Sequence, residues 1–169
     1  MNIYVQKLNE NAQIPTYASE GDFGCDVIAT SEKEVAPGVW EYGLGLRYEM
    51  DRLSLERDIR EAFYGDAYYE HAIVLDNWLI SIEGRPKSGV WKRGMVLTNC
   101  IGTLDEFFRG EMKAVFYHVM PNMPRYKAGD SVVQMMVRIS PKINWIEKEH
   151  ISTDTTRGEK GFGEMDEQK

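Results

Sequence analysis

Short runs in which apolar and polar residues alternate recur along most of the chain, and this two-residue period predicts β-strands. Turns rich in glycine and proline separate the runs. The predicted strands cover residues 3–8, 26–29, 39–50, 73–82, 95–97, 112–119, 131–139 and 144–150. Many short strands between tight turns predict an all-β fold of jelly-roll or barrel type.

One segment, residues 51–63, has a different period, because its apolar residues fall at helical spacing. Asp51 or Ser54 can cap the start of this helix, and Gly65 suits the position just past its end. We therefore expect one short amphipathic helix in this segment.

The length of 169 residues favours a single domain with its own core. We assign residues 1–151 to this domain. Residues 152–169 are polar, charged and rich in glycine, which predicts a mobile C-terminal arm. The sequence contains no internal repeat that would indicate a second domain.

Composition narrows the class of protein. Hydrophobic residues make up 43% of the chain and charged residues 28%, without an apolar run long enough to cross a bilayer. Acidic residues outnumber basic ones by 27 to 20, and the net charge of −7 argues against a broad surface for nucleic acid. Two distant cysteines, Cys25 and Cys100, predict no disulfide framework, and we expect a cytoplasmic protein with no membrane or nucleic-acid partner.

Residues 99–118 form the most informative stretch, since two strands there are joined by a turn with Gly102 and Gly110. Glycine lets a backbone turn tightly or approach another molecule closely. Asp105 lies beside the backbone groups of this turn, so the hairpin suits a planar polar ligand. An ordinary surface hairpin with a solvated acid is the alternative interpretation.

Three other places carry candidate chemistry. Asp26 stands where a turn becomes a strand, and it either serves a site or binds its own turn. Residues 86–89 lie in a basic stretch whose serine and glycine can hold phosphate oxygens, although a basic surface loop has the same composition. Gln134 has apolar neighbours on both sides, which fits a satisfied core amide as well as a ligand contact.

The arm contains an aromatic residue, Phe162, between two glycines, five residues after Arg157. An aromatic ring on a mobile arm can close over a flat ligand while the arginine reaches an anion. We expect the arm to become ordered when the ligand binds.

Taken together, five segments resemble, in order, the motifs of the trimeric deoxyuridine triphosphatase (dUTPase) family. They are residues 24–27, 86–89, 99–110, 129–134 and 157–163. The resemblance covers most of the chain except residues 51–83.

The resemblance implies hydrolysis of dUTP to dUMP and pyrophosphate with Mg²⁺, in a homotrimer of distorted jelly rolls with active sites between subunits. Asp105 would be the general base that activates water for attack on the α-phosphorus. Asp26 would act on the metal through waters. The family pattern assigns substrate binding to Lys87, Ser88, Gly89, Asn99, Gly102, Leu104, Phe108, Gln134, Arg157, Phe162 and Gly163.

Several positions depart from the family pattern. Lys87 stands where arginine is usual, which keeps the charge but loses the planar fork, and Arg85 could supply that fork. Phe107 and Phe108 replace the common aspartate and tyrosine. In the arm, Glu164 places a carboxylate near the expected position of the triphosphate.

Two other functions remain open. dCTP deaminase shares the expected fold, but it requires a glutamate where this chain has Val115. A nucleotide-binding or regulatory protein without turnover is the second alternative. The sequence does not specify how strictly UTP is refused or what the 51–83 insertion does.

Overall fold

The computed structural model describes residues 1–64 and 77–161. Ten strands, one α-helix and one 3₁₀ helix are labelled. The strands are β1 (Asn2–Lys7), β2 (Cys25–Ile28), β3 (Ser31–Ala36), β4 (Val39–Gly43), β5 (Leu46–Asp51), β6 (Trp78–Pro86), β7 (Met95–Leu97), β8 (Gly102–Asp105), β9 (Lys113–His118) and β10 (Ser131–Pro141). The helices are α1 (Arg52–Tyr64) and η3 (Ser88–Arg93).

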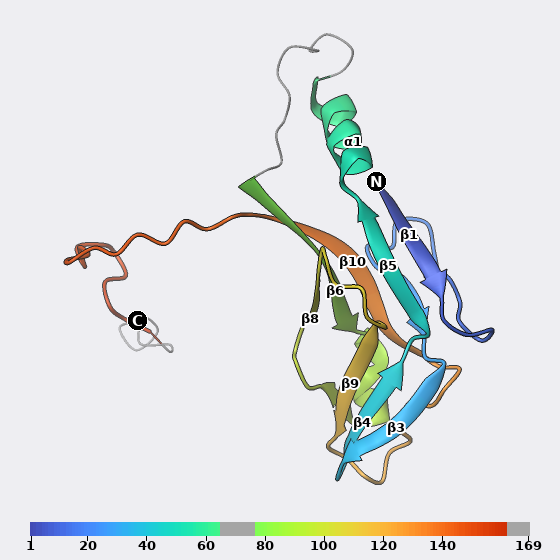
Figure 1. The fold of residues 1–169 in the computed structure, drawn as a ribbon. Coiled ribbons are helices and arrows are strands. Elements are labelled where there is room, and N and C mark those ends of the chain that lie inside the picture. The colour runs from blue at the N-terminus through green and yellow to red at the C-terminus, as the bar shows by residue number, and fades with distance from the viewer. Residues whose placement is uncertain (65–76, 162–169) are drawn as a thin grey trace.

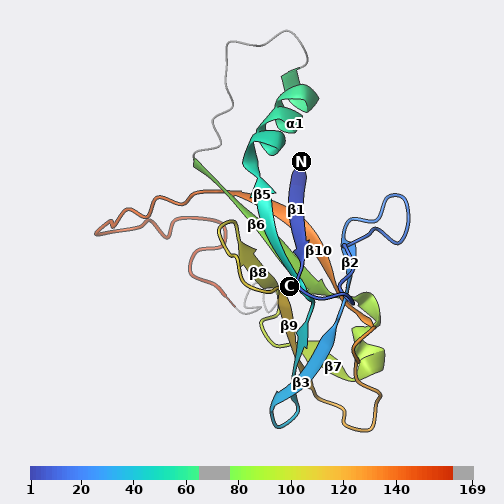
Figure 2. The same ribbon diagram turned by 45° about the vertical axis from the view of Figure 1, so that its right-hand side comes forward.

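The strands form three antiparallel sheets, which Figures 1 and 2 show from two sides. One four-stranded sheet has the order β2-β10-β6-β8, a second has the order β3-β4-β9-β7, and β1 pairs with β5 in a ribbon. The predicted β-rich fold of jelly-roll type is therefore confirmed. Among the described residues, strand pairing does not close the sheets into a barrel.

Residues from all three sheets meet in a single hydrophobic core. At its centre the rings of Tyr42, Phe116 and Tyr126 meet edge to face, with centroids 5.5 to 6.3 Å apart. The Tyr42 hydroxyl donates to the Tyr126 carbonyl over 2.8 Å, so its polar end is satisfied although the side chain is fully buried. This packing fixes the second sheet behind the candidate site.

The helix lies where the sequence predicts it, and Asp51 is its cap. The Ser54 amide donates to Asp51 Oδ1 over 3.1 Å. Leu55 is buried and Ile59 packs against the core. The N-terminal amine forms an ion pair with Asp58, which ties the start of the chain to the helix. The predicted end at Gly65 lies outside the described residues.

Some strand predictions were wrong in position. Residues 31–36 form β3, which has little alternation because its side chains are mostly exposed. The predicted strand at 39–50 is two strands, and the break includes Gly45 at φ +64°. The predicted strand at 73–82 is β6, which runs on to Pro86; residues 73–76 lie outside the described part.

Residues 144–150 form no strand, which contradicts the sequence prediction. The chain leaves the body after β10 and extends away from both sheets (Figure 1). A strand needs a neighbouring strand to satisfy its backbone groups, and the described part of this chain provides none there. Ile143, Trp145, Ile146 and Ile151 are consequently 62 to 85% exposed.

Candidate functional site

Two glycines create a slot between the four-stranded sheets. Gly84 on β6 stands opposite Gly102 on β8 in the strand register. A small cavity of about 40 Å³ lies against this pair, lined also by Asn99, Leu104 and residues of β9 and β10. A Cβ on Gly102 would come within 3.3 Å of Asn99 Nδ2, so the slot depends on the missing side chain.

The predicted hairpin is present, but its connection is more than a turn. β7 and β9 are antiparallel partners, with Leu97 opposite Phe116. Between them the chain crosses to the other sheet, where β8 pairs with β6. Because one connection reaches both sheets, Asn99, Gly102 and Leu104 come together at the cavity, as the sequence predicts. Gly84 was missed, since no feature near residue 84 marks it as the partner of Gly102.

Asp105 ends β8, three residues after Gly102, and its side chain is exposed. A hydrogen bond from β5 fixes its backbone, because the Tyr48 hydroxyl donates to the Asp105 carbonyl over 2.5 Å. Burial, and then the Asp105 charge, raises the pKa of Tyr48 to about 12, so this phenol stays a neutral donor. Tyr48 was not predicted as part of the site.

The ring of Phe108 owes its position to Gly110. A Cβ on Gly110 would lie 2.6 Å from Cζ of that ring, which is closer than packing permits. Phe108 is 39% exposed, whereas the neighbouring Phe107 is 80% exposed. Phe108 is thus the better placed of the two to stack against a ligand.

A second group of candidates gathers around Asp26 on the other face of the sheet. Lys87 Nζ lies 2.5 Å from Asp26 Oδ2 and 3.1 Å from Ser131 Oγ. Gln134 is the cross-strand partner of Asp26. Burial by itself raises the pKa of Asp26, but Lys87 and Gln134 more than offset this and hold the pKa below its usual value.

The structure brings Asp26, Lys87 and Gln134 together, and we call them with Ser131 the charged cluster. Gln134 is half-buried beside this carboxylate, so it is not enclosed in the core. Ser88 and Gly89 begin η3 directly after Lys87. Arg85 is engaged elsewhere, because its Nη2 lies 2.8 Å from Glu83 Oε2.

The slot and the charged cluster lie on opposite faces of one sheet. Gln134 is opposite Arg85, whereas Gly102 is opposite Gly84, and successive side chains on a strand point to opposite faces. Asp105 pairs with Ser81, four residues from Arg85 on β6, so its side chain is on the face of the charged cluster and not on that of the two glycines. Asp105 and Asp26 are therefore separated by roughly 13 Å along the strands and about 14 Å across them.

The arm residues join neither group. Arg157 Nε donates to the Lys160 carbonyl over 2.9 Å, within the arm itself. Phe162 and Gly163 lie outside the described residues. Their assigned contacts with substrate thus stay predictions.

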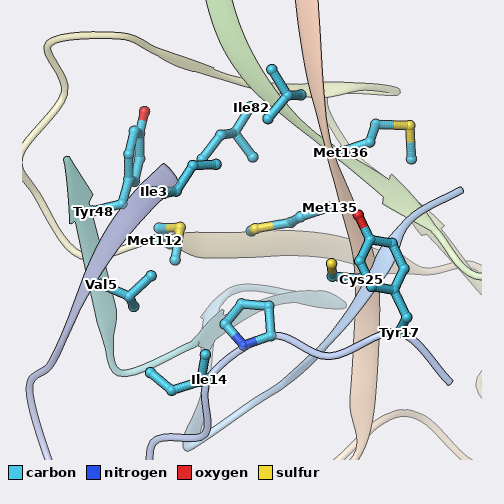
Figure 3. Close-up of a pocket in the computed structure, with 12 residues that line it drawn as sticks. Ile3, Val5, Ile14, Tyr17, Cys25, Tyr48, Ile82, Met112, Met135 and Met136 are labelled. Atoms are coloured by element: carbon cyan, nitrogen blue, oxygen red, sulfur yellow. The ribbon is translucent and has the colours of Figure 1, made fainter. Parts of the chain in front are cut away.

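A larger apolar cavity of about 210 Å³ lies between β1, β5, β10 and the loop at Ile14 (Figure 3). Met112, Met135 and Tyr17 point toward it from three sides (Figure 3). Its walls offer few polar groups that could hold a nucleotide, so it is distinct in chemistry from the slot.

The donors present fit a metal only if the ligand brings most of the coordination. Among residues 1–64 and 77–161, three or more His, Cys, Asp or Glu side chains nowhere gather as a metal site would require. Asp26 Oδ1 is buried, and none of the described residues donates a hydrogen bond to it. One such oxygen suits Mg²⁺, which commonly binds through one or two carboxylates, waters and substrate phosphates.

Comparison with known proteins identifies relatives along almost the whole chain. A deoxyuridine 5'-triphosphate nucleotidohydrolase of Helicobacter pylori strain J99 is 30% identical over 164 residues, 96% of this chain and 95% of the relative. The protein of the same description from Clostridium novyi strain NT is 29% identical over 164 residues, 96% and 97% of the two chains. No protein-family model matches the chain.

Solved structures show the same fold. A Staphylococcus bacteriophage 80alpha dUTPase with dUpNHpp matches with a TM-score of 0.68 at 14% identity, over 97% of this chain and 98% of that one. The dUTPase of phage phi11 of S. aureus, in a structure that reveals coordination of a structural Mg(II) ion, matches with a TM-score of 0.59 at 12% identity, over 89% and 99%.

Fold and site together define a jelly-roll-type β-protein with a narrow polar slot beside an exposed carboxylate. The sequence relatives make the assignment specific. The chain belongs to the deoxyuridine 5'-triphosphate nucleotidohydrolase family. Within the described residues, no helix is long and apolar enough to span a membrane.

Proposed function

We propose that this protein hydrolyses dUTP to dUMP and pyrophosphate. The observation that carries the proposal is the glycine-lined slot with Asp105 at the end of the same strand. Gly102 and Asp105 are three residues apart, about 10 Å along a strand, which is the scale of a nucleoside with its first phosphate. Family membership supports the same substrate.

Uracil occupies the slot in this proposal. Asn99 and the backbone of β8 supply donors and acceptors for the edge of the base, and the narrow cavity of about 40 Å³ leaves no space for an added methyl group. Phe108 packs against the deoxyribose. Leu104 forms the apolar wall and Gly102 keeps the slot open.

Asp105 acts as the general base. Its exposed carboxylate takes a proton from water as the water oxygen attacks the α-phosphorus. The bond between the α-phosphorus and the bridging oxygen breaks, and pyrophosphate leaves with that oxygen. Tyr48 holds the Asp105 carbonyl at 2.5 Å, which fixes the strand end from which the base projects.

The charged cluster receives the phosphates. Lys87, Ser88, Gly89 and Gln134 bind phosphate oxygens, and Arg157 reaches the terminal phosphate from the arm. Asp26 is the residue that would hold Mg²⁺ through water, and the ion would supply charge neutralisation at the triphosphate. Phe162 and Gly163 cover the base when the arm of residues 152–169 closes on the domain of residues 1–151.

A complete site requires more than one copy of the chain, and we propose a homotrimer. Support comes from the distance between Asp105 and the charged cluster, roughly 13 Å along the strands and about 14 Å across them, since the α-phosphorus and the later phosphates of one nucleotide do not span it within one chain. The exposed apolar residues from Ile143 to Ile151 also favour a partner, because an isolated chain leaves them in water. Each slot would then be served by the charged cluster of a neighbouring copy.

Pyrophosphate release tests the activity. The purified protein is mixed in turn with dUTP, dCTP and dTTP in the presence of Mg²⁺, and pyrophosphate and base identity are measured. We expect release from dUTP well above the other two, and a fall of about 10³-fold or more in Asp105→Asn with retained binding of the analogue dUpNHpp. Absence of release from dUTP contradicts the proposal, and conversion of dCTP to a uracil nucleotide would indicate a deaminase despite Val115.

Co-expression tests the shared site. Asp105→Asn and Asp26→Asn chains carrying different tags are expressed together, and mixed oligomers are isolated through both tags. If each site combines two neighbouring chains of a trimer, about one site in three of every mixed trimer contains both native residues, so activity rises above that of either variant. Mixed oligomers no more active than the better single variant would contradict the shared site.

A further inference from the structure

Lys87 and Asp26 are proposed above to bind different partners, phosphate and metal, yet in this structure they bind each other. The ammonium lies 2.5 Å from Asp26 Oδ2 and 3.1 Å from Ser131 Oγ. The lysine side chain is 29% exposed and the aspartate 19% exposed, so the pair is partly shielded from water. Such pairs are less screened than surface ion pairs.

The two partners differ in how firmly the fold holds them. Asp26 lies in β2 and Ser131 begins β10, and both strands pair across the sheet. Lys87 precedes η3, in extended backbone at φ −68° and ψ 151°. Its four-carbon stem lets the ammonium move while the carboxylate and the hydroxyl stay in place.

A divalent cation cannot approach this carboxylate freely while the ammonium is there. Lys87 occupies Oδ2 and brings a positive charge within contact distance of any ion near Oδ1. Like charges at contact distance repel at the effective dielectric of a partly buried site, although solvent weakens the effect. The described residues offer no cluster of other carboxylates to offset this repulsion.

We propose that Lys87 is a built-in counter-ion that keeps divalent metal off Asp26 until a nucleotide arrives. The phosphates of the nucleotide then take over the ammonium, and Asp26 becomes free for the metal. This inference rests on the phosphate and metal roles given under the proposed function. It makes metal and nucleotide binding mutually dependent, so each tightens the other by the same factor.

The test measures metal binding without nucleotide. Mn²⁺ is titrated into the protein, and the free ion is counted by its paramagnetic resonance signal. Without nucleotide, a single carboxylate binds Mn²⁺ weakly; Lys87→Met removes the charge and keeps an unbranched side chain, so we expect this weak affinity to be about tenfold higher than that of the native chain. Mg²⁺ should displace the bound Mn²⁺.

Two variants serve as controls. Lys92→Met removes a cation five residues away that lies over Trp91 rather than on Asp26, and it should leave the Mn²⁺ affinity unchanged. Lys87→Arg restores a cation beside Asp26 and should bind Mn²⁺ as weakly as the native chain. A melting curve for each variant establishes that the fold is intact.

Equal Mn²⁺ affinity in a folded Lys87→Met variant and the native chain would overturn the inference. The double variant Lys87→Met with Asp26→Asn should lose the gain, and persistence of the gain would place the metal elsewhere and also overturn it. Hydrolysis of dUTP is measured on the same native sample. If the native chain hydrolyses dUTP but Lys87→Met does not bind Mn²⁺ more tightly, this inference alone is refuted. If Lys87→Met binds Mn²⁺ more tightly but the native chain does not hydrolyse dUTP, the proposed function alone is refuted.

Discussion

The slot and the charged cluster lie on the same four-stranded sheet but differ in the residues that form them. The slot is opened by the backbone of two glycines, Gly84 opposite Gly102, and most of its other walls are uncharged side chains such as Leu97, Leu104 and Met135. The cluster consists of side chains from β2, β10 and the start of η3, centred on the ion pair of Lys87 with Asp26. The slot is a cavity between two sheets, whereas the charged cluster is an ion pair with its polar neighbours on an outer face.

This difference separates recognition from activation. The slot is preformed, because strand pairing fixes both of its glycines and a ligand needs to displace no protein group there. In the charged cluster the Lys87 ammonium already contacts Asp26 and Ser131, so a ligand must replace these contacts. We infer that base selection depends on geometry, whereas phosphate and metal binding depend on exchange of ionic partners.

The largest expected effect comes from filling the slot. Gly102→Val places a branched side chain where even a Cβ lies 3.3 Å from Asn99 Nδ2. We expect affinity for dUpNHpp, measured by calorimetry, to fall by about 100-fold or more, since overpacking leaves the base no room.

Val96→Thr is the control, because this exposed side chain on β7 does not line the slot and points to the opposite face from Leu97, which does. This variant should bind the analogue within about twofold of the native chain, as most surface substitutions are nearly neutral. Equal loss in both variants would show that the base lies outside the slot.

An intermediate effect should come from the inserted helix, because Arg52 at its start contacts the residue after Asp105. Arg52 on α1 donates to the Trp78 carbonyl over 2.8 Å and lies 3.6 Å from Glu106, the residue after Asp105. Arg52→Gln should lower turnover about three- to tenfold and leave analogue affinity nearly unchanged, since a base displaced slightly loses more rate than binding. Arg57→Gln on the same helix, 60% exposed, should have no effect on turnover.

Most strands, the helix and part of the slot could be predicted, because each depends on residues close together in the sequence. The alternating runs located most strands, and the helical spacing after Asp51 located α1 within a residue at its start. Asn99, Gly102 and Leu104 were brought together as expected, since they lie on one connection of a few residues. Local sequence is sufficient where one short segment builds the feature.

What could not be predicted depends on pairing between distant segments. Gly84 matters only because β6 pairs with β8, and Tyr48 only because β5 passes beneath Asp105. The expected strand at 144–150 failed for the same reason, since none of residues 1–64 and 77–161 forms a strand beside it. Its apolar pattern is typical of a strand, but the partner that a strand requires is a long-range property.

The smallest expected effect concerns the pH dependence of stability. It distinguishes the two regions because the pKa of Tyr48 is raised and that of Asp26 is lowered. Tyr48 has a pKa of about 12 against an ordinary 10.0, so its contribution to stability is complete below pH 10 and is lost as pH rises through 12. When the pH is raised from 10 to 12, the free energy of unfolding of Tyr48→Phe should therefore fall less than that of the native chain, as measured by denaturant unfolding. Its stability at neutral pH should be lower by about 1 kcal/mol, because the Asp105 carbonyl loses its donor.

Asp26→Asn is the counterpart from the charged cluster. The pKa of Asp26 lies below its ordinary 3.8, so its contribution is present above that pH and is lost as pH falls through the lowered value. This variant should be less sensitive to acid than the native chain and should keep the native alkaline limb. If instead Asp26→Asn altered the alkaline limb as Tyr48→Phe does, the two regions would be energetically coupled, and the separation of a preformed slot from an exchangeable cluster would be wrong.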